Sequence, residues 1–417
     1  MQQFSLSANI EEGQNKDFNY IVTPNAQDVA SGIVNGYNSG IHSFTIIGSY
    51  GTGKSCFLLA LEKDLQSKGQ HNLINPQTLS SCKKYEVLKI VGDYKDLASL
   101  MRNKLATDGT ADNVLDELRN RYSQAKKRGS FLIIFIDEFG KVLEHAAKND
   151  PEQELYFMQK LAEFVNVPTR QILLITTLHQ NFSAYARKLS TVQKEEWNKV
   201  KGRFKELVFI EPVEQLLYLA SKQNGSCKDI GENASGLNKL CQLAKDTKFV
   251  SDGLSFETTE ALYPLEPFSA YAITQAIQRY GQNERSLFSF LNTKGANSLC
   301  EYEDGFYCLA NCYDYILHNF YSYLKDANAD SMQWSSMQVA LERVEGQSWE
   351  TKNELLGAIK IVKTIGLLNL LGNSSFKMTR EQTANYAKVA LGVEDALHIL
   401  NLLEQYKIIR FASYKLR

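Results

Sequence analysis

The stretch SFTIIGSYGTGKSCFLLALEKDL, Ser43 to Leu65, decides the fold of this 417-residue chain. It opens with a short apolar run that is typical of a buried strand. The run leads into a segment that fits G-x-x-x-x-G-K-[ST] at every fixed position, and apolar residues then recur at helical spacing. The order strand, glycine-rich loop and helix predicts a phosphate-binding loop in an α/β domain.

The residue types of this loop indicate how it would hold a phosphate. Its glycines let the backbone N–H groups point inward at an anion, and the following helix adds the positive end of its dipole. Lys54 would reach the β- and γ-phosphates of ATP, and the Ser55 hydroxyl would ligate Mg²⁺. We therefore predict ATP and Mg²⁺ as ligands. The candidate nucleotide-binding residues are Gly48, Ser49, Tyr50, Gly51, Thr52, Gly53, Lys54, Ser55 and Cys56.

A second apolar run, Phe131 to Ile136, ends in two carboxylates, Asp137 and Glu138. Such an uninterrupted run is typical of a strand buried on both faces of a parallel sheet, and its ending is that of a Walker-B strand. Asp137 would hold Mg²⁺, and Glu138 would polarise the attacking water. The pair could also cap the helix that we expect next along the chain, and both roles can hold at once.

A third buried strand, residues 171–179, carries polar side chains at its carboxyl end. Ligands of open α/β sheets bind outside the carboxyl ends of the strands. Thr177 and His179 are therefore candidates to contact the γ-phosphate or the attacking water. A structural histidine with satisfied hydrogen bonds is the alternative interpretation of His179.

Length and composition limit the class of protein. A chain of 417 residues exceeds one hydrophobic core, which favours roughly two or three domains. The net charge of −1 gives no overall field that would attract nucleic acid. The seven cysteines form no C-x-x-C pair, and the spacing of Cys300, Cys308 and Cys312 is not that of a zinc site. We expect reduced thiols in a cytoplasmic protein, without a signal peptide or a membrane span.

The chain divides into segments of different character. We expect a flexible arm at 1–20, the phosphate-loop core at 21–212, and helical segments at 213–300 and 301–349. Residues 350–417 read as helix, helix, helix and strand, the order of a winged helix. The sequence stops where the second wing strand would begin, so we expect the natural protein to continue.

The order of these motifs resembles an AAA+ ATPase of the initiator-like branch. This resemblance implies an α/β fold in which a parallel sheet with helices on both faces is followed by an α-helical lid and a winged-helix-like domain. It also implies a homo-oligomer, as a ring or a filament. Four segments resemble the large ATPases of bacterial anti-phage loci, of the phage-exclusion and phage-growth-limitation type, which implies other proteins of a defence locus as partners. They are LHQNFSAYA (178–186), EWNKVKGRF (196–204), FIEPVEQLL (209–217) and GQNERSLFSFL (281–291).

The resemblance adds two arginines to the candidate site. Arg203 stands where AAA+ proteins carry the arginine finger, which reaches the γ-phosphate held by a neighbouring subunit. A solvated basic helix end is the alternative for Arg203. Arg285 follows a glycine-punctuated turn into a helix, which is the sensor-2 arrangement, and would report the state of the nucleotide. Residues 20–24 are the segment that the resemblance places against the adenine.

Three functions remain open at this point. The first is an oligomeric ATPase that drives an anti-phage complex, and the second is a DNA-binding initiator or loader. The third is a signalling switch that hydrolyses ATP slowly. The expected recognition helix, Val393–Tyr406, contains three acidic residues, and its only basic candidate is His398. We therefore expect DNA to bind weakly.

Overall fold

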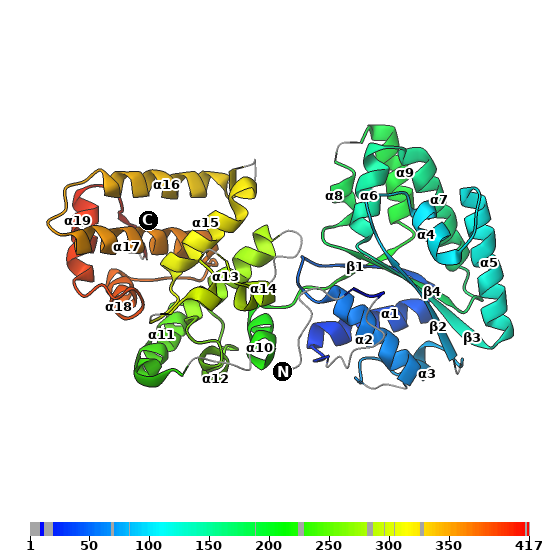
Figure 1. Cartoon of the computed structure of the whole chain (residues 1–417), viewed down its shortest axis with the longest axis horizontal. Helices are drawn as coiled ribbons and strands as arrows, with labels where there is room; N and C mark the ends of the chain where they lie inside the picture. The colour runs from blue at the N-terminus through cyan, green and yellow to red at the C-terminus, as the bar shows by residue number, and fades with distance from the viewer. Residues whose placement is uncertain are drawn as a thin grey trace. The chain divides into compact units, whose positions relative to one another are not determined.

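The chain forms two compact units, one that ends at Glu211 and one that begins at Pro212 (Figure 1). The computed structural model describes residues 9–11, 20–67, 71–82, 84–187, 189–223, 229–281, 287–295, 297–303, 305–325, 329–412 and 415–416. None of the helices within these ranges combines the length and apolar character that crossing a membrane requires.

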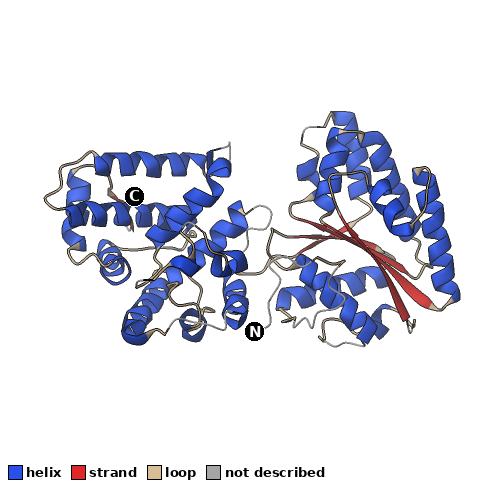
Figure 2. Cartoon of the chain, viewed as in Figure 1, coloured by secondary structure: helices blue, strands red, loops and turns tan. Residues whose placement is uncertain are grey.

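The first unit is built on a five-stranded parallel sheet with the strand order β2-β3-β4-β1-β5 (Figure 2). Side chains of β3 alternate between its two faces, so that Ile134 joins one hydrophobic core and Ile133 the other. Burial on both faces explains the uninterrupted apolar runs in the sequence. The strands are β1 (Ser43–Ile47), β2 (Lys84–Val91), β3 (Ser130–Asp137), β4 (Ile172–Leu178) and β5 (Lys205–Val208).

Helices cover both faces of the sheet, as predicted for the α/β fold (Figure 1). One face carries α1 (Pro24–Asn38), α2 (Lys54–Ser67) and α3 (Pro76–Leu79). The other face carries α4 (Leu97–Leu105), α5 (Ala111–Lys127), α6 (Phe139–Lys148), α7 (Pro151–Val165), α8 (Phe182–Tyr185) and α9 (Thr191–Lys201).

A buried contact joins the first helix of this unit to its last residue. Thr23 is the N-cap of α1, and its hydroxyl oxygen accepts a hydrogen bond from the backbone N–H of Ala26. The same hydroxyl donates to Glu211 Oε1 at 2.5 Å. Burial raises the pKa of Glu211, which lies just before the second unit begins. Thr23 thus caps α1 and also connects the start of this helix to the residue at which the chain leaves the first unit.

Residues 9–11 differ from the flexible arm that we expected at 1–20. Ile10 is fully buried in the core that also holds α1. Glu11 pairs with Lys104 at 2.8 Å and accepts a hydrogen bond from the backbone N–H of Val91. A single apolar residue between polar neighbours shows no periodicity, so the sequence carried no signal for this contact.

The second unit is helical and ends in a two-stranded antiparallel sheet. Its elements are α10 (Val213–Gln223), α11 (Ala234–Asp246), α12 (Phe256–Glu260), α13 (Pro267–Tyr280), α14 (Leu287–Asn292), α15 (Leu309–Lys325), α16 (Ser331–Glu345), α17 (Lys352–Leu371), α18 (Arg380–Leu391), α19 (Ala396–Gln405), β6 (Phe411–Ala412) and β7 (Lys415–Leu416). Two short 3₁₀ turns lie at Gly231–Asn233 and Leu299–Glu301.

One hydrophobic core runs through the whole second unit, from Val213 to Ile409. At its centre the fully buried Glu266 accepts a hydrogen bond from the Tyr386 hydroxyl at 2.9 Å. That hydroxyl accepts in turn from the backbone N–H of Leu309 at 3.0 Å. These bonds join α13, α15 and α18, which lie in the three different segments that we predicted after residue 212. The finer division at 213–300, 301–349 and 350–417 stays a prediction.

The end of the chain has the order of elements that we predicted for a winged helix. Helices α17, α18 and α19 are followed by β6, which pairs with β7 in antiparallel orientation. A strand that we expected only to begin where the sequence stops is present as β7, and the winged-helix assignment stays a prediction.

Candidate active site

The predicted phosphate loop connects β1 to α2 at the carboxyl edge of the sheet. Gly51 and Gly53 have φ angles of 73° and 93°, a left-handed conformation that glycine adopts readily. A Cβ atom on Gly48 would lie 2.1 Å from the carbonyl oxygen of Phe209. The N–H of Gly48 donates to the carbonyl of Leu178 at 3.0 Å, which joins the loop to the end of β4. The geometry therefore requires glycine at position 48 and favours it at positions 51 and 53.

Lys54 is the first residue of α2, and its ammonium points back into the loop. Its Nζ donates to the carbonyl oxygens of Gly48 at 2.6 Å and Ser49 at 2.8 Å. Burial lowers the pKa of Lys54 to about 8, and the nearby Asp137 and Glu138 oppose that shift. A partly buried ammonium whose loop acceptors are neutral carbonyls fits a phosphate, which would supply a charged acceptor there.

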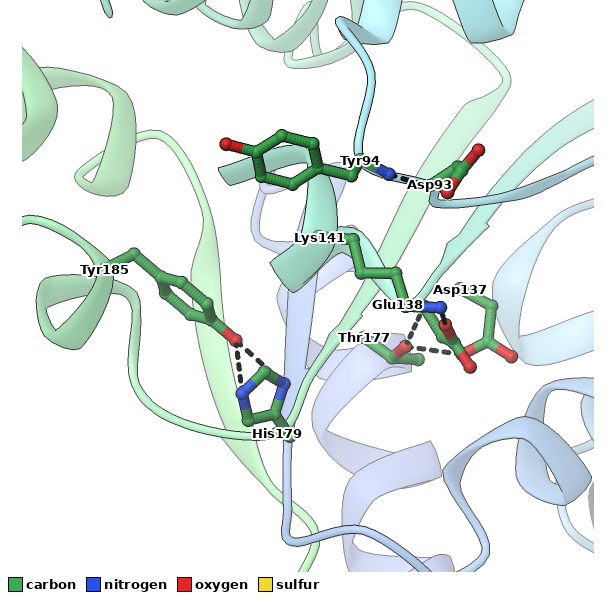
Figure 3. A network of polar contacts seen from close by, with 8 residues as sticks. All are labelled: Asp93, Tyr94, Asp137, Glu138, Lys141, Thr177, His179 and Tyr185. Carbon is green, nitrogen blue, oxygen red and sulfur yellow. Dashed lines mark hydrogen bonds and ion pairs between the residues drawn. The ribbon is translucent and has the colours of Figure 1, made fainter. Parts of the chain in front are cut away.

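The two polar strand ends predicted from the sequence meet beside the loop (Figure 3). Asp137 is the last residue of β3 and is 4% exposed. The Thr177 hydroxyl donates to Asp137 Oδ1 at 2.5 Å. The backbone N–H of Glu138 donates to Asp137 Oδ1 at 3.1 Å and to Thr177 Oγ1 at 3.0 Å. Thr177 therefore orients the predicted Mg²⁺ ligand in this conformation.

Glu138 follows Asp137 with an unusual backbone conformation. Its φ angle is 53°, in the left-handed region, and its side chain makes no capping hydrogen bond to α6. The carboxylate instead pairs with Lys141 and is 42% exposed (Figure 3). Gly92 allows this turn, because a Cβ atom there would lie 2.3 Å from the carbonyl oxygen of Glu138. The side chain is thus not a helix cap and can face a ligand.

His179 is the first residue after β4, and it contacts the loop through an aromatic ring. Its imidazole stacks on Tyr50 with a centroid distance of 4.6 Å and an interplanar angle of 23°. The Tyr185 hydroxyl lies 3.0 Å from His179 Nδ1. Burial, aided by the charge of Lys54, lowers the pKa of His179 to about 4, so the ring is neutral at pH 7. The histidine has satisfied partners and also touches the phosphate loop.

Arg203 lies at the opposite, amino edge of the sheet. Its carbonyl oxygen accepts hydrogen bonds from Ser43 Oγ at 2.6 Å and Asn166 Nδ2 at 2.9 Å, and Ser43 is the first residue of β1. Its guanidinium pairs with Glu163 at 2.7 Å. The five residues of β1 span roughly 16 Å, which exceeds the reach of an arginine side chain. Arg203 therefore does not serve the loop of its own chain.

The structure describes some of the remaining predicted site residues and not others. Arg285 lies outside the described residues, so its sensor-2 role stays a prediction. Ser55 and Cys56 lie on the first turn of α2 and are partly buried. Burial raises the pKa of Cys56 to about 11, so this residue carries a neutral thiol at pH 7. Tyr20 lies close enough to Cys56 for an ionised Cys56 to raise the pKa of the Tyr20 hydroxyl, which puts the predicted adenine segment near α2.

Two neighbours of the site were missed by sequence reasoning. Lys141 follows Glu138 by three residues on a helix, a spacing that brings side chains together, so a signal was present. Tyr185 approaches His179 through a turn and a short helix, an arrangement that no periodic pattern reports.

No protein-family model matches the sequence, and no curated protein matches it. Among solved structures it is similar to the ORC2 protein of Aeropyrum pernix in ADPNP–ADP complexes, at 12% identity and a TM-score of 0.38, over 98% of this chain and 92% of that one. It is also similar to Drosophila ORC bound to DNA, at 11% identity and a TM-score of 0.34, over 95% and 85% of the two chains. A Walker-type ATPase of Pyrococcus abyssi gives 10% identity and a TM-score of 0.33, over 95% and 93%.

At these TM-scores the similarities carry no weight for the site. The fold class instead rests on the strand order, the glycine-rich loop between β1 and α2, and the acidic end of β3.

Thr177→Val tests the hydroxyl that orients Asp137, because valine keeps the branched shape and removes the donor. A lost hydrogen bond to a charged group predicts a fall in ATP turnover of about tenfold or more. The Mg²⁺ concentration for half-maximal turnover should rise, while ADP affinity without Mg²⁺ stays unchanged. Thr191→Val, at an exposed position on α9, is the control. Unchanged turnover and unchanged Mg²⁺ dependence in Thr177→Val would show that the hydroxyl does not orient Asp137.

Proposed function

We propose that this chain is an AAA+ ATPase that binds ATP with Mg²⁺ and hydrolyses it. One observation carries the proposal: Asp137, Glu138 and Thr177 are hydrogen-bonded to one another at the edge of the sheet that also holds the glycine-rich loop. The three residues come from two motifs that are separate in the sequence, the acidic end of β3 and the polar end of β4, and the partly buried Lys54 completes the set.

The residues divide the work of phosphoryl transfer among them. The loop N–H groups and Lys54 bind the phosphates, and Ser55 with Asp137 would hold Mg²⁺, which neutralises phosphate charge when bound. Glu138 orients the attacking water and accepts its proton. Thr177 keeps the carboxylate of Asp137 in place.

Two substitutions separate binding from chemistry. Lys54→Ala should weaken ATP binding about tenfold or more, because it removes a charged donor to the phosphates. Glu138→Gln should keep ATP affinity and lower turnover about 100-fold or more, because it removes only the base. Phosphate release and equilibrium nucleotide binding are the measurements, and Glu152→Gln, an exposed carboxylate on α7, is the control. Wild-type turnover in Glu138→Gln would refute the assignment of the base.

The finer part of the proposal is a role in a bacterial anti-phage defence complex. It is supported by the resemblance of four sequence segments and by no comparison with a known protein. The same Glu138→Gln variant tests it in cells that carry the surrounding locus. Phage plating should rise to the level of cells without the locus, and unchanged protection would count against a defence role for ATP hydrolysis.

Oligomerisation is proposed from the position of Arg203. Its guanidinium is 35% exposed at the amino edge and is held by Glu163, whose side chain is equally accessible. An exposed ion pair of this kind contributes about 1 kcal/mol or less to stability. The phosphate of a nucleotide bound by a neighbouring chain can therefore replace Glu163 as the partner of Arg203.

Mixing variants tests whether Arg203 acts on a neighbour. Arg203→Ala should lower turnover about tenfold or more, and mixing it with Lys54→Ala should restore part of the activity. Recovery is expected because one interface then joins an intact loop to an intact arginine. Arg119→Ala, an exposed arginine on α5, should lose no activity of its own. Absence of recovery in samples that co-assemble would show that Arg203 is a surface charge.

The alternative of a DNA loader meets an unfavourable charge arrangement in the second unit. Helix α19 contains no lysine or arginine, and it exposes Leu397. Nearby cations are paired with carboxylates: Arg380 with Glu404 and Lys388 with Glu394, each at 2.9 Å. These cations would have to exchange partners before they could contact phosphates.

We therefore expect the full chain to bind duplex DNA no more tightly than about micromolar at physiological salt, with a steep loss as salt rises. A fluorescence titration with and without ATP measures this affinity, and ATP turnover is followed with and without the same duplex. Sub-micromolar binding together with DNA-stimulated turnover would place the loader function first. Tight binding would then come from contacts between the DNA backbone and the side chains of Lys407, Arg410 and their basic neighbours.

A further inference from the structure

The phosphate loop carries an aromatic side chain that the phosphate chemistry does not use. Tyr50 occupies the third position of the loop, and its ring stacks on His179 with the centroids 4.6 Å apart. The ammonium of Lys54 lies 6.0 Å from the centroid of the same ring. The loop is therefore attached to the residue that follows β4 by a side-chain contact as well as by the backbone bond from Gly48.

His179 is itself held from its other side. The Tyr185 hydroxyl lies 3.0 Å from His179 Nδ1, and the two rings meet edge to face at 81° (Figure 3). Tyr185 lies on α8 and is only 7% exposed, so it is a fixed support. A Cβ atom on Gly140 of α6 would lie 2.3 Å from the Tyr185 hydroxyl and 3.1 Å from His179 Cε1. Glycine at this position leaves the room that the pair occupies.

The stack is neutral at physiological pH. Burial raises the pKa of Tyr50 to about 12, and burial together with Lys54 lowers that of His179 to about 4. The charged groups that interact with this cluster are Lys54, Glu138 and Glu144. A neutral ring adds no positive charge at the loop, and its stack on Tyr50 is the contact that joins it to the loop.

We infer that His179 is a positioning residue that holds Tyr50, and through it the phosphate loop, in the conformation that accepts a nucleotide. The inference rests on the proposed nucleotide binding and differs from a sensor role, in which His179 would contact the γ-phosphate. A loop fixed by the stack loses less conformational freedom when it binds, so the stack improves affinity through pre-organisation. Removing it should weaken ATP and ADP binding alike.

A double-mutant cycle on nucleotide affinity tests this directly. Tyr50→Ala and His179→Ala should each weaken both ATP and ADP by roughly 2- to 10-fold, the range that an aromatic pair is worth. The double variant should be no weaker than the more affected single variant, because both remove one contact. His179→Phe keeps the stack without the ring nitrogens and should retain near wild-type affinity. Tyr94→Ala, an exposed tyrosine outside the stack, is the control and should bind normally.

The outcomes separate the inference from its competitors. Additive effects in the cycle, or a His179→Phe variant as weak as His179→Ala, would overturn the positioning role. Unchanged affinities with reduced turnover in His179→Ala would replace it with the sensor role. Thermal unfolding of each variant shows whether a loss is global, and Tyr50→Leu and His179→Leu repeat the cycle with bulkier apolar side chains if the alanine variants do not fold. A wild-type chain that binds neither ATP nor ADP would refute the proposed function as well. If the wild-type chain binds nucleotide without hydrolysing it, the double-mutant cycle can still be measured, because it depends on affinity alone.

Discussion

The parallel pairing of β1, β3 and β4 is the constraint on which the candidate site depends. Parallel strands end at one edge of a sheet, so the register that pairs Ile136 with Thr176 also sets Asp137 beside Thr177. The bond from the Gly48 N–H to the end of β4 brings the loop to the same edge. A shift of one residue would exchange the faces of every side chain in the strand. Both faces of β3 are buried and closely packed, so that shift would force each of its side chains into a space shaped for another.

The position of Glu138 is set by its backbone. A non-glycine residue in the left-handed region is disfavoured by about 1–2 kcal/mol, and the surrounding structure has to supply this energy. Gly92 does so in part, since its N–H donates to the carbonyl of Asp137 at 2.7 Å and its missing side chain leaves room for Glu138. The exposed pair with Lys141 contributes about 1 kcal/mol or less. The carboxylate can therefore turn from Lys141 toward a water while its Cα atom stays in place.

The sequence predicted those parts of the structure that depend on local pattern. The apolar run before Asp137 and the glycine-rich loop before Lys54 are short-range signals, and both the strand and the loop are present where we expected them. The contacts that it did not predict join residues far apart in the chain. The stack of Tyr50 on His179 and the burial of Ile10 depend on tertiary packing, for which neither residue carries a periodic signal.

The same limit explains the second unit, where the helical character was predicted but the shared core was not. Helical periodicity shows which face of a helix is apolar and not which neighbour covers that face. The hydrogen bond between Tyr386 and the buried Glu266 joins two segments that we had predicted as separate. In the sequence, a glutamate followed by proline looks like an ordinary helix start, and nothing shows that the carboxylate is buried.

The two edges of the sheet impose a rule on any assembly in which Arg203 completes a site. One chain presents its loop at the carboxyl edge and its arginine at the amino edge, and the length of β1 keeps the two apart. In a two-fold dimer, each arginine could reach the loop of the other chain only if the two sheets were antiparallel. Both sites would then be complete, and the assembly would stop at two chains. A head-to-tail contact completes one site and leaves one loop and one arginine unused at the ends. Such a contact continues until a ring closes or a filament forms, so the number of chains per active assembly distinguishes the two symmetries.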